Sequence, residues 1–120
     1  MSIQSALAGI RMRCVAQMAQ TLPRLLELRA ALDQPGDSRA HLDEIRFAAH
    51  KSAGVAETLG FRRLGKLAQT LDQGLSDHLG RATPGPMPLT LAFLLDEYLS
   101  EMAAIVAAEA CPSGASQDPV

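Results

Sequence analysis

Apolar residues recur every three or four positions along most of the chain, which is the spacing of one face of an α-helix. The first series runs through Ile3, Leu7, Ile10, Cys14, Met18, Leu22, Leu25, Leu28 and Leu32. Pro23 lies inside it, and because a proline removes one backbone hydrogen bond, we expect the helix to kink or to split in two there. Thr21 is available to cap the second part. The pattern therefore predicts a first helix with an additional N-terminal helical segment.

A turn and a glycine divide the middle of the chain into two further helices. Residues 34–38 (Gln-Pro-Gly-Asp-Ser) have the composition of a turn, so the second helix is predicted over about residues 39–58. Gly60 follows, at a position where a left-handed glycine commonly ends a helix. A third helix is predicted from about Phe61 to near Gly80, because leucines recur there at helical spacing.

The last third of the chain contains one more helix between two irregular segments. Three prolines exclude regular helix from residues 82–88, so this segment is a connection. Residues 111–120 are rich in Pro, Gly, Ser and Asp, and we expect a disordered tail there. The apolar positions of the helix between them are Leu91, Leu94, Leu95, Tyr98, Met102 and Ile105. The prediction is an all-α domain over residues 1–110, an up-and-down antiparallel four-helix bundle.

Composition and charge narrow the class of protein. The 120 residues, 48% of them hydrophobic, suffice for one modest core, and an aromatic content of 3% favours helix over sheet. A net charge of -2 gives no electrostatic footprint for nucleic acid or an anionic membrane. The sequence has no apolar run of the roughly 18 residues that a membrane span needs and no signal-peptide pattern, so we expect a cytoplasmic protein. Cys14 and Cys111 lack the spacing of a metal site or a disulfide framework, and Cys14 is expected to fill the core.

His50 stands out on the second helix because it points away from the predicted core. At about 100° per residue, its direction lies about 140° from that of Ile45, the centre of the apolar stripe, whereas Phe47 and Gly54 lie on the side of His50. A glycine inside a helix costs about 1 kcal/mol relative to alanine, so Gly54 requires a steric reason. Because it lies one turn after His50, it would leave the imidazole accessible to a second protein. An exposed Phe47 beside it indicates a docking patch.

The segment 47–67 resembles the signature of histidine phosphotransfer (HPt) domains, the monomeric four-helix bundles of bacterial multistep phosphorelays. That pattern has a phosphoacceptor histidine, a glycine four residues later, small residues and a Gly-Phe or Gly-Ala before the next helix. The matching positions here are His50, Gly54, Val55-Ala56 and Gly60-Phe61. At the level of architecture, the resemblance extends over about residues 1–109.

The resemblance implies a chemistry for His50. The imidazole would attack a phosphoaspartate on a receiver domain, hold the phosphoryl group as a phosphoramidate and pass it to an aspartate of a second receiver. The implied partners are receiver domains of response regulators or of hybrid histidine kinases. The sequence contains no nucleotide-binding loop and no acidic triad at metal spacing, so we expect no cofactor on this chain and Mg²⁺ on the partner receiver. The protein would then be a phosphoryl carrier without kinase activity of its own.

The chain departs from the family pattern at one position. HPt domains commonly have a lysine three residues after the histidine, where it contacts the phosphoryl group, but this chain has Ala53 there and Lys51 directly after His50. The residues expected to contact the phosphate or to dock the partner are Lys51, Gly54, Phe47, Arg46 and Glu57. Arg62 and Arg63 could supply the positive field instead. His41 and His78 are not placed as metal partners of His50.

Two other classes of protein fit part of this pattern. The dimerisation helices of a sensor histidine kinase also carry a phosphorylated histidine, but they usually have an acidic residue directly after it, where Lys51 stands here, and no ATP-binding domain is present. The alternative is an HPt-like adaptor bundle that docks signalling partners without phosphotransfer, in which His50 is only a solvated side chain. Phosphorylation of His50 distinguishes the adaptor from the carrier.

Overall fold

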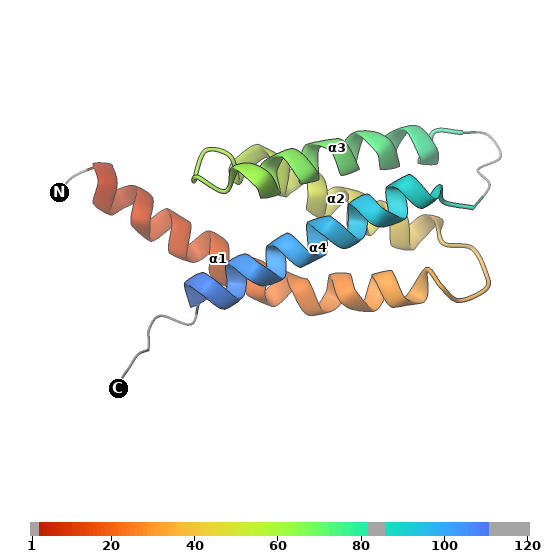
Figure 1. The fold of residues 1–120 in the computed structure, drawn as a ribbon, viewed down its shortest axis with the longest axis horizontal. Helices are drawn as coiled ribbons and strands as arrows, with labels where there is room; N and C mark the ends of the chain where they lie inside the picture. The colour runs from red at the N-terminus through yellow and green to blue at the C-terminus, as the bar shows by residue number, and fades with distance from the viewer. Residues whose placement is uncertain (1–2, 82–85, 111–120) are drawn as a thin grey trace.

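The computed structural model of the chain describes residues 3–81 and 86–110. This part of the chain forms four helices and contains no strand: α1 (Ile3–Ala31), α2 (Arg39–Val55), α3 (Arg62–Leu79) and α4 (Leu89–Ala110). Figure 1 shows them running up and down in an antiparallel bundle. The predicted all-α four-helix bundle is therefore confirmed. The tail predicted over residues 111–120 and part of the connection, residues 82–85, lie outside the described residues.

The first helix is continuous through Pro23. Of the kink or split expected there, the split does not occur, and Thr21 lies inside α1 instead of capping a second segment. Leu25 and Leu28, which follow the proline, are almost completely buried, and this packing compensates for the backbone bond that the proline removes. Figure 1 shows the first half of α1 at an angle to the second half, extending beyond the bundle. The additional N-terminal segment of the prediction is thus this first half of α1.

The core lies between the four helices along the predicted stripes. On α2 it contains Ile45 and Ala49, both fully buried, and on α3 it contains Leu71 and Leu75. The helices that pack most closely are α2 with α3 and α1 with α4, whereas α1 and α2 have the smallest interface of the neighbouring pairs. Cys14 is half-buried and packs against this core.

Two glycines bring α3 close to its neighbours. A Cβ atom on Gly74 would collide with Leu91 Cδ2 of α4, and one on Gly65 would lie 3.2 Å from the backbone nitrogen of Glu57. A side chain at Gly65 would press on the backbone of Glu57, whereas one at Gly74 would require the Leu91 side chain to rotate. The close approach at Gly65 fixes the register of α3 against the residues that follow α2.

The turn between α2 and α3 is held by α1. The helix α2 ends at Val55, three residues before the predicted end, and Gly60 has a φ of 95°, the left-handed conformation predicted for it. Arg11 Nη1 donates a hydrogen bond of 3.3 Å to the carbonyl oxygen of Leu59, and its guanidinium lies 4.4 Å from the ring centroid of Phe61. The same guanidinium pairs with Glu109 Oε2 of α4 at 3.0 Å. Arg11 therefore ties the turn to both α1 and α4.

Candidate functional site

The side chain of His50 is 67% exposed, as the helical periodicity predicts, and it contacts one acidic residue of α3. Its Nδ1 lies 2.9 Å from Asp72 Oδ2. Because an ionised carboxylate only accepts hydrogen bonds, Nδ1 carries the ring proton and donates this hydrogen bond to Asp72 Oδ2. In the neutral ring this leaves the lone pair on Nε2, which is the atom available to an incoming group.

Asp72 is in turn placed next to a cation of α2. The Asp72 side chain is only 21% exposed, and its Oδ1 is buried without a hydrogen-bond partner. Arg46 Nη1 lies 3.6 Å from this oxygen, and Arg46 Nε bonds Asp43 Oδ1 at 3.2 Å. The guanidinium thus compensates the negative charge that Asp72 places beside the imidazole.

Asp72 was not identified in the sequence as a site residue. One signal was available, because Asp72 is the only charged residue between Lys66 and Asp77, in a helix whose other positions there are apolar or uncharged. Such a signal indicates that the carboxylate has a specific role, but it does not indicate which residue of α2 it contacts.

The surface one turn after His50 is open. Gly54 is exposed, and a Cβ atom built on it would meet nothing within 4 Å. The protein itself therefore has no need for a glycine at this position. Phe47 is 55% exposed on the same part of α2. Both positions agree with the predicted docking patch, whose role stays a prediction.

The predicted cations and acid near His50 lie in different surroundings. Lys51 Nζ lies 5.4 Å from the ring centroid of Phe47, in cation–π contact with it. Ala53 is half-buried and packs against the core. Glu57 is exposed in the turn after α2, where its backbone contacts Gly65. The structure thus brings Arg46 next to the partner of His50 and directs the Lys51 ammonium toward Phe47.

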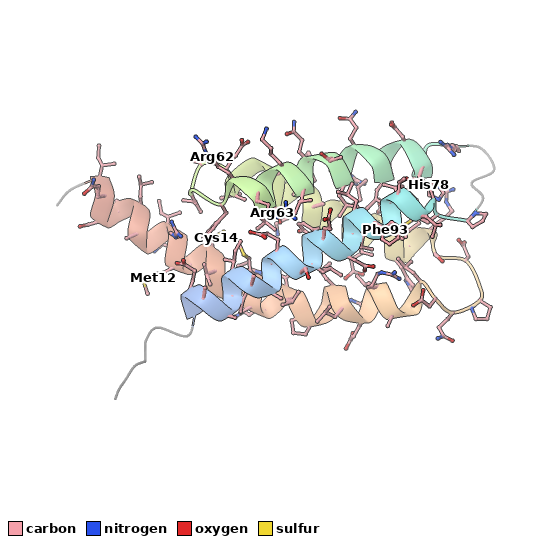
Figure 2. All side chains as sticks on the ribbon, viewed as in Figure 1. Met12, Cys14, Arg62, Arg63, His78 and Phe93 are labelled. Carbon is pink, nitrogen blue, oxygen red and sulfur yellow. The ribbon has the colours of Figure 1, made fainter. Side chains whose placement is uncertain are left out.

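The two arginines at the start of α3 point to different sides of that helix (Figure 2). Arg63 Nε lies 3.3 Å from Glu101 Oε1, and its Nη2 lies 3.7 Å from Glu97 Oε2, so this side chain is directed toward α4. Arg62 is exposed beside Lys66 in a shallow surface hollow of α3. Neither arginine contacts the His50 and Asp72 pair.

A buried hydrogen bond fixes the orientation of α2 close to the site. Ser52 Oγ lies 2.8 Å from the hydroxyl oxygen of Tyr98 on α4, and Tyr98 is fully buried. Burial raises the pKa of Tyr98 to about 12, with the hydrogen bond to Ser52 acting weakly in the opposite direction. Because Ser52 faces inward at this bond, His50, two residues earlier, is held on the outer side of α2.

The other two histidines lie apart from His50. His78 is 4% exposed, and its Nδ1 has no hydrogen-bond partner, while His41 is half-buried near the start of α2. Within residues 3–81 and 86–110, no three His, Cys, Asp or Glu side chains come together as metal ligands would. None of the described helices is both long enough and apolar enough to cross a membrane.

Comparison with known families gives one result. The model of the Hpt domain matches residues 11–108, which include His50 and Asp72 and nearly all of the four helices. No curated protein and no solved structure matches the chain.

Proposed function

The chain belongs to the Hpt domain family, which carries phosphoryl groups on histidine in phosphorelays and interacts there with receiver domains, and we propose that His50 is the phosphoryl-accepting residue. The observation that supports this most is the 2.9 Å hydrogen bond from Nδ1 to Asp72, because it leaves Nε2 exposed with a free lone pair. A nucleophile positioned by a neighbouring carboxylate through its other nitrogen is a recurring arrangement for imidazole.

In the proposed reaction, Nε2 of His50 attacks the phosphorus atom of a receiver phosphoaspartate. The bond between phosphorus and the aspartate oxygen breaks, the carboxylate leaves with its electron pair, and a phosphorus–nitrogen bond forms. The positive charge that develops on the ring is stabilised by Asp72 through Nδ1–H. Transfer to the aspartate of a second receiver is the same reaction in reverse, and we expect Mg²⁺ to be held by the receiver in both steps.

A nearby cation would stabilise the phosphoryl group, and Ala53 stands where the family commonly has a lysine. We assign this role to Arg46 or Lys51, with Phe47, Gly54 and Glu57 in the surface that docks the receiver. Arg46 lies one helical turn before His50 and is already paired with Asp72. The carrier would act as a cytoplasmic monomer.

The proposal is tested by single-turnover transfer from a phosphorylated receiver domain to the full chain. His50→Gln should fold and accept no label, although His41 and His78 remain. Asp72→Asn should keep the shape of the side chain but slow transfer by roughly tenfold or more, since a hydrogen bond to a charged group contributes about 1.5–3 kcal/mol. Nitrogen chemical shifts of the imidazole, measured by NMR, should report Nδ1 protonation in the wild type and a changed tautomer balance in Asp72→Asn.

Label retained by His50→Gln would show that another residue is phosphorylated. If receivers transfer no label to the wild type while still binding it, the chain is instead the adaptor bundle that docks partners without phosphotransfer. An unchanged transfer rate in Asp72→Asn would remove Asp72 from the mechanism and leave the assignment of His50 to its own test.

A further inference from the structure

The outer side of α1 carries a second row of apolar residues, separate from the row that packs in the core. Its members are spaced by alternating steps of four and three residues, which is the heptad spacing of a coiled-coil seam. The two largest, Met12 and Leu26, are 72% and 50% exposed, and Figure 2 shows Met12 pointing away from the bundle. We call this row the outer stripe, and it contains Met12, Ala16, Ala19, Pro23, Leu26 and Ala30.

The outer stripe lies on the side of α1 that is turned away from α2. Gln17 of α1 lines the surface between these two helices, together with Ala48 of α2. At about 100° per residue, Leu26 points about 180° away from Gln17 around α1. The outer stripe is therefore separate from the surface around His50 that is proposed to dock a receiver.

The helix α4 continues this apolar surface beside α1. Asp96 of α4 points toward α1, because it pairs with Arg29 at 2.7 Å. Leu89 and Phe93 are 75% and 66% exposed. The exposed residues that point within about 60° of Asp96 around α4 are Leu89, Phe93, Ser100, Ala103 and Ala107. Since Arg29 compensates Asp96, the outer stripe and these residues form one nearly uncharged surface, the α1–α4 face.

We propose that the α1–α4 face binds a second copy of this chain, with the two α1 helices packed antiparallel about a two-fold axis. When the axis is level with Thr21, midway between Ala19 and Pro23, each large residue of the outer stripe faces a small residue of the second copy. The pairs across the interface are Met12 with Ala30, Leu26 with Ala16 and Pro23 with Ala19. Large side chains thus enter the spaces above alanines, as knobs enter holes in a coiled coil.

The charges along the edge of the outer stripe fit the same arrangement. Arg13, Gln20 and Glu27 recur every seven residues there. Arg13 forms no ion pair with a carboxylate in the described part of the chain, and Glu27 is 71% exposed and shares Arg24 with Glu44. In the antiparallel pair the two edges meet, and Arg13 comes within about 3 Å, along the axis, of the level of Glu27 in the second copy. One axis therefore matches both size and charge, which favours a second copy over an unrelated protein.

The size of the α1–α4 face sets the strength of the association. The outer stripe spans about 27 Å of helix, and two packed helices are about 18 Å wide. The face thus covers about 500 Å² on each copy, or about 1,000 Å² in total, which is the lower limit for a specific interface. We expect a dissociation constant in the micromolar range.

This inference goes beyond the proposed function and does not rest on it. Each chain has its own His50 and Asp72, so one copy is sufficient for the transfer reaction and the carrier can act as a monomer below the dissociation constant. At higher concentration, the two copies would associate with both His50 side chains still exposed.

The test is sedimentation velocity of the full chain from about 1 to about 500 µM, which should show a monomer converting to a dimer. Leu26→Glu places a charge in the outer stripe and should remain monomeric over the whole range. Val55→Glu is the matched control, because Val55 is also an exposed apolar residue, 43% exposed, but lies on α2. It should associate as the wild type does. Circular dichroism checks that each variant is folded.

A charge exchange tests the antiparallel arrangement. Arg13→Glu and Glu27→Arg should each weaken the dimer by about threefold to tenfold, because like charges then meet twice across the axis. The double variant restores opposite charges and should associate within about twofold of the wild type. His50→Gln should dimerise normally and Leu26→Glu should accept the phosphoryl group normally, so failure of this inference and failure of the proposed function are distinguishable.

Four results would overturn the proposal. A chain that stays monomeric at about 500 µM has no such interface. A dimer that Val55→Glu disrupts and Leu26→Glu does not would lie on another surface. A double variant that associates more weakly than either single variant would contradict the antiparallel arrangement. Sedimentation of a monomeric chain with phosphatidylglycerol vesicles, abolished by Leu26→Glu, would assign the α1–α4 face to a membrane.

Discussion

Replacing Gly54 with leucine should stabilise the isolated protein and slow its phosphoryl transfer, two effects of opposite direction from one side chain. Gly54 lies in α2, and a Cβ atom there would meet nothing within 4 Å, so the larger residue meets no steric obstacle in the fold. Leucine is the better helix former by up to about 1 kcal/mol. Because Val55 is the last residue of α2, we expect only part of this gain, about 0.5 kcal/mol, and a melting temperature raised by about 2–4 °C.

The loss of transfer follows from the position of the new side chain relative to His50. Residues four apart lie one above the other on a helix, so Leu at this position would cover the approach to the imidazole. In-line transfer requires the reacting atoms within about 3–3.5 Å, and a displacement of about 1 Å can cost about 100-fold in rate. We therefore expect Gly54→Leu to transfer at least about tenfold more slowly than the wild type.

The assay combines thermal unfolding followed by circular dichroism with single-turnover transfer from a phosphorylated receiver. Gly54→Ala is the matched control, since it brings most of the helix stabilisation with only a methyl group, and it should transfer faster than Gly54→Leu. Gly74→Ala is the opposite case: its Cβ would collide with Leu91 Cδ2, so the Leu91 side chain must rotate, and we expect a smaller gain in stability than from Gly54→Ala. Equal transfer rates for Gly54→Leu and the wild type would refute the steric role, and a lowered melting temperature would refute the open position of Gly54.

Two further predictions concern α4 and the missing lysine. Burial raises the pKa of Tyr98 to about 12, so the folded state holds the phenol proton more tightly than the unfolded chain does. The contribution of this group to the free energy of unfolding is therefore complete below about pH 10. About 3 kcal/mol of it is lost as the pH rises through 12. Tyrosinate absorbance reports this directly, since Tyr98 is the only tyrosine, and titration near pH 10 in the folded protein would contradict the complete burial of Tyr98. Lys51→Ala should shorten the phosphohistidine lifetime or slow transfer by about tenfold or less, and Ala53→Lys should lengthen the lifetime. If neither changes, the cation must be Arg46, another arginine or a group of the partner.

The helices could be predicted from the sequence because hydrophobic periodicity is a local signal. Their ends agree within a few residues, as for α2, which ends at Val55 instead of near residue 58. Of the kink or split expected at Pro23, the split does not occur, and the reason is physical. The local rule counts the lost backbone bond, but the burial of Leu25 and Leu28 against the other helices depends on tertiary structure that the local rule does not contain.

In the candidate site, too, the features set by one helix could be predicted, and those set by the packing of two helices could not. The exposure of His50 and Phe47 follows from the periodicity of one helix and was predicted. The contact between His50 and Asp72 depends on the register between α2 and α3. A shift of one residue in α3 would move Asp72 by about 1.5 Å along the helix and about 100° around it. That register is set by the turn at Gly60 and the close contact at Gly65, which no periodicity encodes.

The charges around His50 bear on how the site can act without a lysine at position 53. A phosphoryl group on Nε2 would add negative charge to a ring that already bonds the Asp72 carboxylate. Lys51 Nζ lies over the ring of Phe47, whereas Arg46 Nη1 lies 3.6 Å from Asp72 Oδ1. Since electrostatic repulsion acts between the phosphoryl group and Asp72, a cation in contact with Asp72 reduces it without having to move. Arg46 is therefore better placed than Lys51 to take the part of the absent lysine.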